Sequence, residues 1–501
     1  MQQHSFDIVV IGGGVNGTGI AMDAAGRGLN VLLCEMNDLA SATSSNSSKL
    51  IHGGLRYLEH YEFRLVREAL AEREALLRSS PHIMWPMRFH LPHQPHLRPG
   101  WMIRTGLFLY DHLAKREMLP GSKSITFGSD SPLKPEITRG FEYSDGWVDD
   151  ARLVVLMARK AQQMGAIVRP RTLCTEALRE DEHWTITLQD KVTGDEYNVT
   201  AKALVNAAGP WASSLFAETI AAPAPKQIRL VKGSHLVVPR LNSGDEAYIL
   251  QNEDDRIVFV IPYEEHFSLI GTTDVEYEGD PSLAKISPAE TDYLLKIVNT
   301  YFRHQTTAGD VVWSYSGVRP LIDDEENAQK ASRDYSYELD TNQGQAPLMS
   351  IFGGKITTYR KLAEIATDKL CDFFPAAGEP WTHDAVLPGG NFNSKASLQA
   401  ELESEFPWLP EALARRYVRT YGTTARDLLA GASSLEGMGI LFTGTLYQKE
   451  VDYLVAREWA WTADDILWRR TKQGLYASGT QSRALEDYLA SAFANNPDTR
   501  S

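Results

Sequence analysis

An apolar run over residues 6–11 leads directly into the glycine sequence Gly12-Gly-Gly14-Val-Asn-Gly17. A helix of small residues is predicted over 18–27, and a second apolar strand over 31–34 ends at Glu35. A strand, a GxGxxG turn, a helix and a strand in this order form a βαβ unit. Such a unit folds as part of a parallel sheet covered by helices, so the sequence predicts an α/β fold that begins with a Rossmann-type unit.

The residue types in this unit match the parts of a dinucleotide. Gly12 permits the tight turn, Gly14 lets the backbone approach a pyrophosphate, and Gly17 lets helix and strand pack closely. The N–H groups at the helix N-terminus face the phosphates. The Glu35 carboxylate accepts from the ribose hydroxyls and would repel the 2′-phosphate of NADP. We therefore predict a dinucleotide cofactor, and these residues do not separate NAD from FAD.

The segment that follows the second strand, residues 39–58, favours FAD. Five serines, one threonine and one asparagine lie within residues 41–48. Small hydroxyls and backbone N–H groups can line a pyrophosphate and a ribityl chain, and Gly53 and Gly54 let a flat ring come close. A cofactor of the length of FAD needs such a second contact surface.

Two later segments, 203–211 and 348–373, repeat the order of apolar strand, glycine and helix. A chain that returns to one cofactor surface after long insertions has an interleaved, two-domain arrangement. Between residues 226 and 320 the sequence changes to short strand-like runs separated by polar turns. We predict that these runs form an antiparallel sheet over the flavin.

Six motifs, distributed along nearly the whole chain, occupy residues 11–17, 44–58, 206–211, 271–274, 315–320 and 352–362. The most specific of them are the His-Gly-Gly-Leu-Arg-Tyr and Gly-Val-Arg-Pro segments. With these motifs the chain resembles the FAD-dependent, aerobic respiratory glycerol-3-phosphate dehydrogenases of bacteria. That family belongs to the D-amino-acid-oxidase-like flavoproteins of glutathione-reductase type.

The resemblance implies that sn-glycerol 3-phosphate is oxidised to dihydroxyacetone phosphate by hydride transfer from C2 to a non-covalently bound FAD, which a membrane quinone reoxidises. It also implies a discontinuous Rossmann-type FAD-binding domain, an inserted antiparallel β-rich substrate domain and an α-helical C-terminal domain. We place the FAD-binding domain at 1–80, 145–225 and 345–388, the substrate domain at 81–144 and 226–344, and the helical domain at 389–501.

The predicted cofactor-binding residues come from the glycine turns and from the serine-rich segment. No metal site is expected, because the three cysteines lie far apart and form no CxxC pair. The cofactor-binding residues are Gly12, Gly14, Asn16, Gly17, Glu35, Thr43, Ser44, Ser45, Ser48, Lys49, Leu50, His52, Gly209, Gly353, Gly354, Lys355, Thr357 and Thr358.

A phosphate dianion joined to a secondary alcohol needs cations that bind the phosphate, and arginine does so with two N–H groups. The resemblance points to five substrate-binding residues, in or beside glycine-rich or loop-rich motifs. Arg319 and Lys355 are also predicted to act in catalysis by stabilising the developing alkoxide. The substrate-binding residues are Arg56, Tyr57, Arg319, Arg333 and Lys355.

His52 and His235 are the candidates for the general base, because a neutral imidazole accepts a hydroxyl proton near pH 7. The competing interpretation for each is a buried histidine that only hydrogen-bonds a backbone group. A third possibility is that Arg319 or Lys355 stabilises the alkoxide and no single strong base acts.

The charge balance argues against a nucleic-acid-binding protein, since 50 Lys and Arg against 65 Asp and Glu give a net charge of −15. The cysteines fit a reducing compartment, and no apolar stretch approaches the roughly 18–20 residues of a membrane span. These features fit a soluble or peripherally attached protein, and the resemblance, with its quinone acceptor, implies a cytoplasmic protein bound peripherally to the inner face of the cytoplasmic membrane. A homodimer stays open as its oligomeric state.

Residues 88–116 are the segment predicted to contact anionic lipid, because basic residues would meet headgroups while aromatic residues settle at the interface. The alternative is a proline-broken loop and a short helix packed on the core. The segment contains Arg88, Arg98, Arg104, Lys115 and Arg116 together with Phe89, Trp101, Phe108 and Tyr110.

Two other functions remain open from the sequence. One is a related flavoprotein oxidase that acts on an amine or amino acid, which would need a carboxylate-binding arginine and an apolar pocket rather than several cations. The other is a dinucleotide-sensing protein that keeps the fold without turnover. Bleaching of a yellow protein by glycerol 3-phosphate separates these possibilities.

Overall fold

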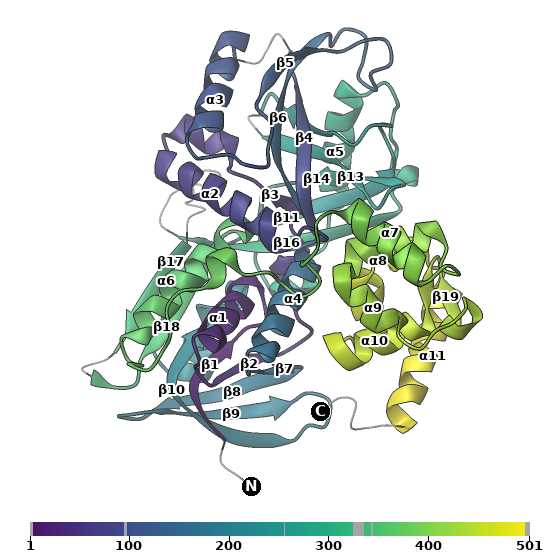
Figure 1. The fold of residues 1–501 in the computed structure, drawn as a ribbon. Helices are drawn as coiled ribbons and strands as arrows, with labels where there is room; N and C mark the ends of the chain where they lie inside the picture. Colours follow the sequence, from purple (N-terminus) through teal and green to yellow (C-terminus); the bar gives the residue numbers. More distant parts are fainter. Residues whose placement is uncertain (1–3, 95–97, 255, 324–334, 342–343, 496–501) are drawn as a thin grey trace.

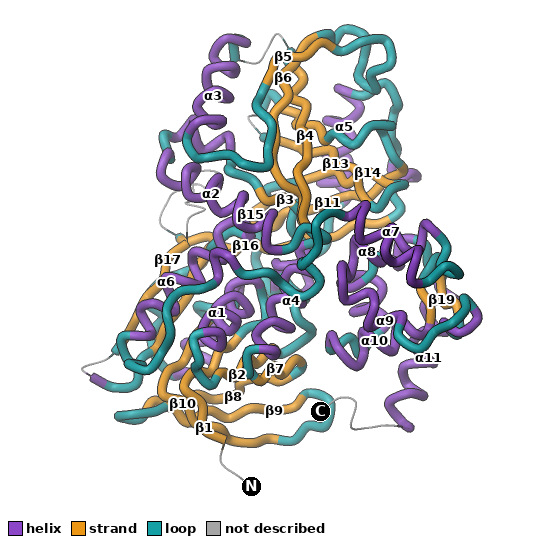
Figure 2. Tube along the Cα trace, in the orientation of Figure 1, coloured by secondary structure: helices purple, strands orange, loops and turns teal. Residues whose placement is uncertain are grey.

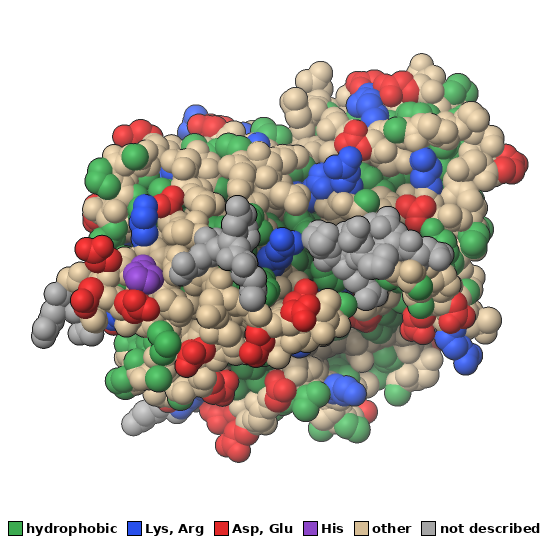
Figure 3. All heavy atoms as spheres, turned by 90° about the horizontal axis from the view of Figure 1, so that it is seen from below, with side chains coloured by type: hydrophobic (Ala, Val, Ile, Leu, Met, Phe, Trp, Pro, Cys, Tyr) green, Lys and Arg blue, Asp and Glu red, His purple; other side chains and the backbone are tan. Residues whose placement is uncertain are grey.

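Two large β-sheets form the body of the molecule, and a helical unit packs beside them at the C-terminal end (Figures 1 and 2). The computed structural model describes residues 4–94, 98–254, 256–323, 335–341 and 344–495. Among the described helices, none combines the length and the apolar character that crossing a bilayer requires. Acidic and basic side chains are interspersed over the face that is seen from below (Figure 3).

The first sheet has eight strands and contains the predicted βαβ unit. β1 pairs in parallel with β2 and with β10, and β10 pairs in parallel with β18. Side chains alternate along β1, so that Ile8 and Val10 pack toward helices α1, α4 and α6, while Val9 and Ile11 pack toward β8 and β9. The strands are β1 (His4–Ile11), β2 (Val31–Glu35), β7 (Ile167–Pro170), β8 (Thr172–Arg179), β9 (Trp184–Asp190), β10 (Glu196–Asn206), β17 (Tyr335–Asp340) and β18 (Leu348–Gly353), and the helices are α1 (Val15–Gly26), α4 (Asp150–Gln163) and α6 (Tyr359–Cys371).

The second sheet has ten strands and is antiparallel except where β4 pairs with β12. It lies above the first sheet in Figure 1, with helices α2, α3 and α5 around it. The strands are β3 (Leu50–Ile51), β4 (Met84–Pro92), β5 (Lys123–Thr126), β6 (Arg139–Val148), β11 (Ile228–Pro239), β12 (Ala247–Gln251), β13 (Ile257–Tyr263), β14 (Phe267–Gly271), β15 (Val275–Glu276) and β16 (Trp313–Ile322), and the helices are α2 (Phe63–Ser79), α3 (Gly100–His112) and α5 (Pro288–Tyr301).

The C-terminal unit is mainly helical and has an apolar core of its own. A short hairpin and a turn of π-helix, η12, interrupt the helices. Trp468 of η12 packs against this core and also contacts the second sheet. Its ring stacks on that of Trp313, with 4.1 Å between the ring centroids. The elements are α7 (Lys395–Glu405), α8 (Glu411–Tyr421), α9 (Ala425–Leu429), β19 (Leu441–Thr443), β20 (Leu446–Tyr447), α10 (Gln448–Glu458), η12 (Asp465–Arg470) and α11 (Gly479–Asn495).

The predicted fold class is confirmed: a discontinuous parallel sheet, an antiparallel substrate-side sheet and a helical C-terminal unit. Two strands belong to a different sheet from the one that the predicted domain boundaries give them. β17 was assigned to the second domain, but it pairs with β18 at the edge of the first sheet. β3 pairs with β6 in the second sheet. Both differences arise because the tertiary fold decides which strands pair. A short strand needs a paired neighbour to satisfy the hydrogen bonds of its backbone groups.

A buried ion pair joins the C-terminal unit to the first sheet. Arg152 of α4 donates from Nη2 to Glu458 Oε1 at 2.9 Å, and the two side chains are 0% and 2% exposed. Neither charge can be solvated in place, so each depends on the other.

We expect Arg152→Met to destabilise the protein by about 3–5 kcal/mol, because the buried Glu458 carboxylate loses its hydrogen-bonded partner and keeps only the more distant Arg470, at 4.0 Å, among the described residues. Urea denaturation followed by tryptophan fluorescence measures the loss. Arg426→Met is the control, since Arg426 pairs with the exposed Glu401 and Glu405 and its loss costs about 0–1 kcal/mol. Equal losses for the two variants would contradict the interpretation.

Candidate functional site

The turn between β1 and α1 forms the centre of the site. Gly12 has φ +113°, and a Cβ on it would lie 2.4 Å from the Ala207 carbonyl oxygen at the end of β10. A Cβ on Gly17 would lie 1.9 Å from the Gly12 carbonyl oxygen. Only glycine fits at these two positions, so the predicted roles of Gly12 in the turn and of Gly17 in close packing are confirmed.

The N-terminus of α1 opens into a cavity that several segments line. Ser44 Oγ accepts the Val15 N–H at 2.9 Å, and Asn16 Nδ2 donates to the Gly353 carbonyl at 3.1 Å. Asn16 Oδ1 is buried and has no hydrogen-bond partner among the described residues. A helix N-terminus favours an anion, and an unsatisfied buried amide oxygen indicates a further ligand group.

Glu35 lies at the carboxyl end of β2, where its two carboxylate oxygens fix the neighbouring backbone. Oε2 accepts the Gly13 N–H at 2.7 Å, and Oε1 accepts the Asn37 N–H at 2.8 Å. Burial raises the pKa of this carboxyl, and the two N–H groups oppose the shift. Each oxygen keeps a lone pair for a ligand hydroxyl, which fits the predicted contact with a ribose.

Half of the predicted cofactor-binding residues line this cavity. They are Gly12, Gly14, Asn16, Glu35, Thr43, Ser44, Gly209, Gly353 and Gly354. The remaining predicted residues are Gly17, Ser45, Ser48, Lys49, Leu50, His52, Lys355, Thr357 and Thr358, which are not among the lining residues of this cavity.

A further set of residues that line the cavity was not predicted from the sequence. These residues lie in one segment without a glycine motif and in another that extends beyond such a motif. One group is on β8, which has no signal beyond that of an ordinary strand. The other follows Gly209, where the motif at 206–211 marked the start of the segment but not its length. These residues are Thr172, Leu173, Cys174, Trp211, Ser214, Leu215, Glu218 and Thr219.

Lys49 is not among the residues that line the cavity. Its side chain is buried, and Nζ donates to Asp150 Oδ1 at 2.7 Å and to the Ser45 carbonyl at 3.1 Å. Lys49 thus links the serine-rich loop to Asp150 at the N-terminus of α4. Its predicted direct contact with the cofactor is not seen as a cavity contact in this structure.

Two predicted substrate-binding cations are held by defined partners. Arg319, on β16, forms an ion pair with Asp274, and its Nη2 donates to Thr272 Oγ1 at 2.9 Å. Lys355 Nζ lies over the Tyr57 ring, 3.8 Å from its centroid. Lys355 follows Gly354, so the second glycine turn brings it to the same side as Tyr57. Arg56 lies in the short helix η2 (Leu55–His60), and Arg333 lies outside the described residues.

The two histidines proposed as bases have different environments. His235 is 2% exposed, its Nε2 is 2.9 Å from Ser48 Oγ, and its ring stacks on Tyr315 at 4.8 Å. Burial, together with the charges of Arg319 and Lys49, lowers the pKa of His235 well below its usual range, so the ring is neutral at pH 7. His52 is half-buried, and its backbone N–H donates to Thr357 Oγ1 at 3.2 Å.

The described residues contain no group of three or more His, Cys, Asp or Glu side chains that could hold a metal ion. Cys34 and Cys174 are buried free thiols, and Cys371 is a partly buried one.

Two models of protein families match this chain. Residues 7–360 match the model of the FAD dependent oxidoreductase family, and residues 380–493 match the C-terminal domain of alpha-glycerophosphate oxidase. The chain is 56% identical to the aerobic glycerol-3-phosphate dehydrogenase of Escherichia coli K12, over 96% of this chain and 97% of that protein.

Two other similarities bear on the cofactor and the substrate. The chain is 49% identical to the D-erythritol 1-phosphate dehydrogenase of Brucella abortus, over 98% of this chain and 99% of that protein. A solved glycerol-3-phosphate dehydrogenase from Bacillus halodurans, complexed with FAD, superposes with a TM-score of 0.76 at 26% identity, covering 100% of this chain and 92% of that chain. The cofactor is FAD.

We expect Glu35→Ala to weaken FAD binding by about tenfold or more, because hydrogen bonds to a charged group are worth about 1.5–3 kcal/mol each. Fluorescence quenching during titration of the apoprotein with FAD measures the affinity. Glu196→Ala removes an exposed carboxylate on β10 and is the control. An unchanged affinity in Glu35→Ala would show that this carboxylate does not bind the cofactor.

Proposed function

Because the chain belongs to the family of FAD dependent oxidoreductases, we propose that it oxidises sn-glycerol 3-phosphate to dihydroxyacetone phosphate. The observation that carries this proposal is the 56% identity to a glycerol-3-phosphate dehydrogenase over nearly the whole of both chains. The glycine turns, Glu35 and the unsatisfied Asn16 amide oxygen fit FAD. When bound there, FAD would supply the hydride acceptor for C2 of the substrate.

In the proposed substrate site, cations bind the phosphate and polarise the reacting oxygen. Asp274 and Thr272 fix the Arg319 guanidinium, so it loses little freedom when a phosphate binds. Lys355 carries its charge beside the Tyr57 ring. We propose that both stabilise negative charge on the substrate, with Arg56 and Arg333 as additional phosphate-binding residues.

The proton of the C2 hydroxyl has two proposed acceptors. His52 is partly exposed and is the one whose ring can meet a substrate directly. His235 is neutral, because of its lowered pKa, but it is buried against Ser48 and Tyr315. A proton would therefore reach His235 through the Ser48 hydroxyl.

Helix α3 is the part of residues 88–116 that we propose meets the membrane. Arg88 is on β4 and pairs with Glu142, Arg116 pairs with Asp111, and Arg104 donates to Ser122. These three side chains of the predicted basic-aromatic surface therefore have partners within the protein. The outer side of α3 instead exposes large apolar side chains: Trp101 (69%), Phe108 (53%), Leu109 (40%) and Met102 (39%).

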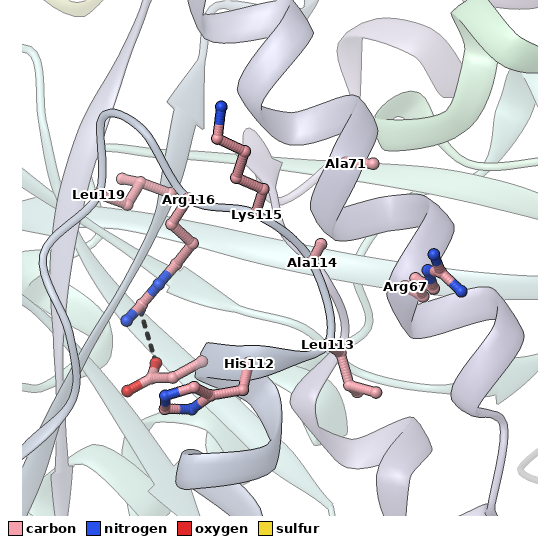
Figure 4. A pocket seen from close by; sticks show the side chains of 9 residues that line it. Arg67, Ala71, His112, Leu113, Ala114, Lys115, Arg116 and Leu119 are labelled. Carbon is pink, nitrogen blue, oxygen red and sulfur yellow. Dashed lines mark hydrogen bonds and ion pairs between the residues drawn. The ribbon is translucent and has the colours of Figure 1, made fainter.

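A hollow of about 640 Å³ lies beside α3, between α2 and the loop that follows α3. Figure 4 shows Arg67 of α2 on one side of it and Lys115 and Arg116 of the loop on the other. Lys115 pairs with Glu117 and Arg116 with Asp111, so part of this charge is compensated. Together with Arg67, these side chains place positive charge beside the exposed apolar ones, which suits an interface with anionic lipid. This surface supports the proposed peripheral contact with the inner face of the cytoplasmic membrane, where a quinone would reoxidise the flavin. A homodimer stays a prediction.

A second candidate substrate is D-erythritol 1-phosphate, because one relative of similar length carries that activity at 49% identity. Both substrates present a phosphate and a secondary alcohol, so the cations described above suit either.

The substrate is decided by adding each compound anaerobically to the purified yellow protein. We expect glycerol 3-phosphate to bleach the flavin absorbance, and D-erythritol 1-phosphate and amino acids to bleach it far more slowly. Arg319→Ala is expected to slow the bleaching about a hundredfold, since it removes a charge that acts on the transition state, and to leave FAD bound. A faster reaction with the erythritol phosphate, or an unaltered Arg319→Ala enzyme, would overturn the proposal.

Replacing Trp101 and Phe108 together by serine is expected to reduce binding to phospholipid vesicles about tenfold or more, because two interfacial aromatic side chains are lost. Vesicle sedimentation measures the bound fraction. Leu283→Ser changes an exposed apolar residue elsewhere on the surface and serves as the control. Binding that is equal in all three proteins would rule out α3 as the membrane contact.

A further inference from the structure

The serine-rich loop, residues 38–50, is called the cofactor loop here because Ala40, Ser41, Ala42, Thr43 and Ser44 line the flavin cavity. Between β2 and β3 its regular structure is one short helix, η1 (Thr43–Ser45). Ala40 and Lys49 adopt left-handed conformations, with φ +60° and +58°, which cost energy in residues other than glycine. The shape of this loop therefore depends on contacts from outside it.

The first of these contacts is made at the start of the loop by the C-terminal unit. Asp38 is 3% exposed. It accepts Arg469 Nε at 2.6 Å, and its two oxygens accept Arg470 Nη1 and Nη2, each at 2.8 Å. Arg470 is fully buried, and its two-pronged pairing with Asp38 is its closest ion pair, with the Glu458 carboxylate 4.0 Å from its Nε.

The second contact is made at the end of the loop through the N-terminus of α4. Asp150 Oδ1 accepts Lys49 Nζ, and Asp150 Oδ2 accepts Ser47 Oγ at 2.8 Å. The preceding residue, Asp149, is the N-cap of α4. Both of its oxygens accept Lys472 Nζ, at 2.5 Å. The C-terminal unit therefore reaches the end of the loop through two adjacent carboxylates.

Asp38 and Asp149 take their ion-pair partners from the C-terminal unit, whereas Asp150 is paired with Lys49 of the loop itself. Burial raises the pKa of Asp149, but the ammonium groups of Lys472 and Lys49 outweigh it and hold that pKa below its usual range. Asp149 is thus ionised. Removing Lys472 would leave Lys49 as the cation beside both Asp149 and Asp150. The attraction of the two carboxylates would draw Lys49 away from the Ser45 carbonyl and change the conformation of the loop.

We propose that residues 469–472 of the C-terminal unit are a positioning element for the cofactor loop, so that this unit sets the affinity of the chain for FAD. The proposal rests on the cavity and on the family's cofactor, and it is independent of which phosphate is oxidised. Arg470 and Lys472 do not line the cavity; they act through Asp38 and through the pair Asp149–Asp150.

The test uses the full-length chain and two variants, Arg470→Met and Lys472→Met. Each is stripped of FAD and titrated with FAD, and binding is followed by fluorescence quenching. We expect the Kd to rise about tenfold or more, as breaking a buried charge pair allows. Turnover is expected to recover at saturating FAD, whereas the KM for the phosphate substrate stays unchanged. Lys472→Arg keeps a cation and is expected to restore most of the affinity.

Arg416→Met is the matched control. Arg416 forms a largely buried pair with Glu450 at 2.7 Å, with side chains 11% and 0% exposed, but wholly inside the C-terminal unit. This variant is expected to lower the melting temperature and leave the FAD affinity unchanged. If Arg470→Met or Lys472→Met fails to fold, Arg469→Gln keeps Arg470 paired with Asp38 and replaces it in the titration.

Two results would overturn the proposal. The first is an FAD affinity that is unchanged in the folded variants of residues 469–472. The second is an equal loss of affinity in Arg416→Met, which would show that general destabilisation of the C-terminal unit is the cause. Neither result bears on the bleaching of the native protein by glycerol 3-phosphate, so the proposed function is tested separately.

Discussion

The close contact between the N-terminus of α1 and the end of β1 is the constraint around which the rest of the site is arranged. A side chain at Gly17 would collide with the Gly12 carbonyl oxygen, so the helix starts directly above the strand and directs its N–H groups into the cavity. Segments from four other parts of the sequence come to this one turn. Their contacting residues are Glu35, Ser44, Ala207 and Gly353.

A second level of organisation comes from buried charge. Asp38 begins the cofactor loop and Asp149 and Asp150 lie beside its end, and cations from the loop and from the C-terminal unit compensate them. Charges removed from water need partners in a fixed geometry. This requirement joins the C-terminal unit to the first sheet, while the stacking of Trp468 on Trp313 joins it to the strand that carries Arg319. The helical unit thus contacts both the cofactor side and the substrate side of the site.

The sequence was sufficient to predict features that depend on a short segment alone. It was insufficient for features that depend on which charges form ion pairs or which strands lie side by side. The GxGxxG turn, Glu35 and the second glycine turn were predicted from spacing, because backbone conformation and strand order are readable in short segments. The sequence predicts residues 88–116 as a basic-aromatic surface or as a loop and short helix packed on the core. It could not show that Arg88 and Arg116 pair with carboxylates, one of which, Glu142, lies on a separate strand. The cavity wall on β8 carried no signal, since an ordinary strand pattern does not reveal its neighbour.

By itself the sequence determined the cofactor class and the fold class, because glycine positions, the terminal acid of β2 and the strand-glycine-helix repeats state local requirements that few folds satisfy. Only the tertiary structure decided which charged side chains lie at the site and which stabilise the surrounding fold through ion pairs. Lys49 supports the loop rather than lining the cavity, and Lys472 reaches that loop through Asp149. These assignments follow from distances between residues far apart in the chain, and burial makes such distances decisive because an unpaired charge is not tolerated there.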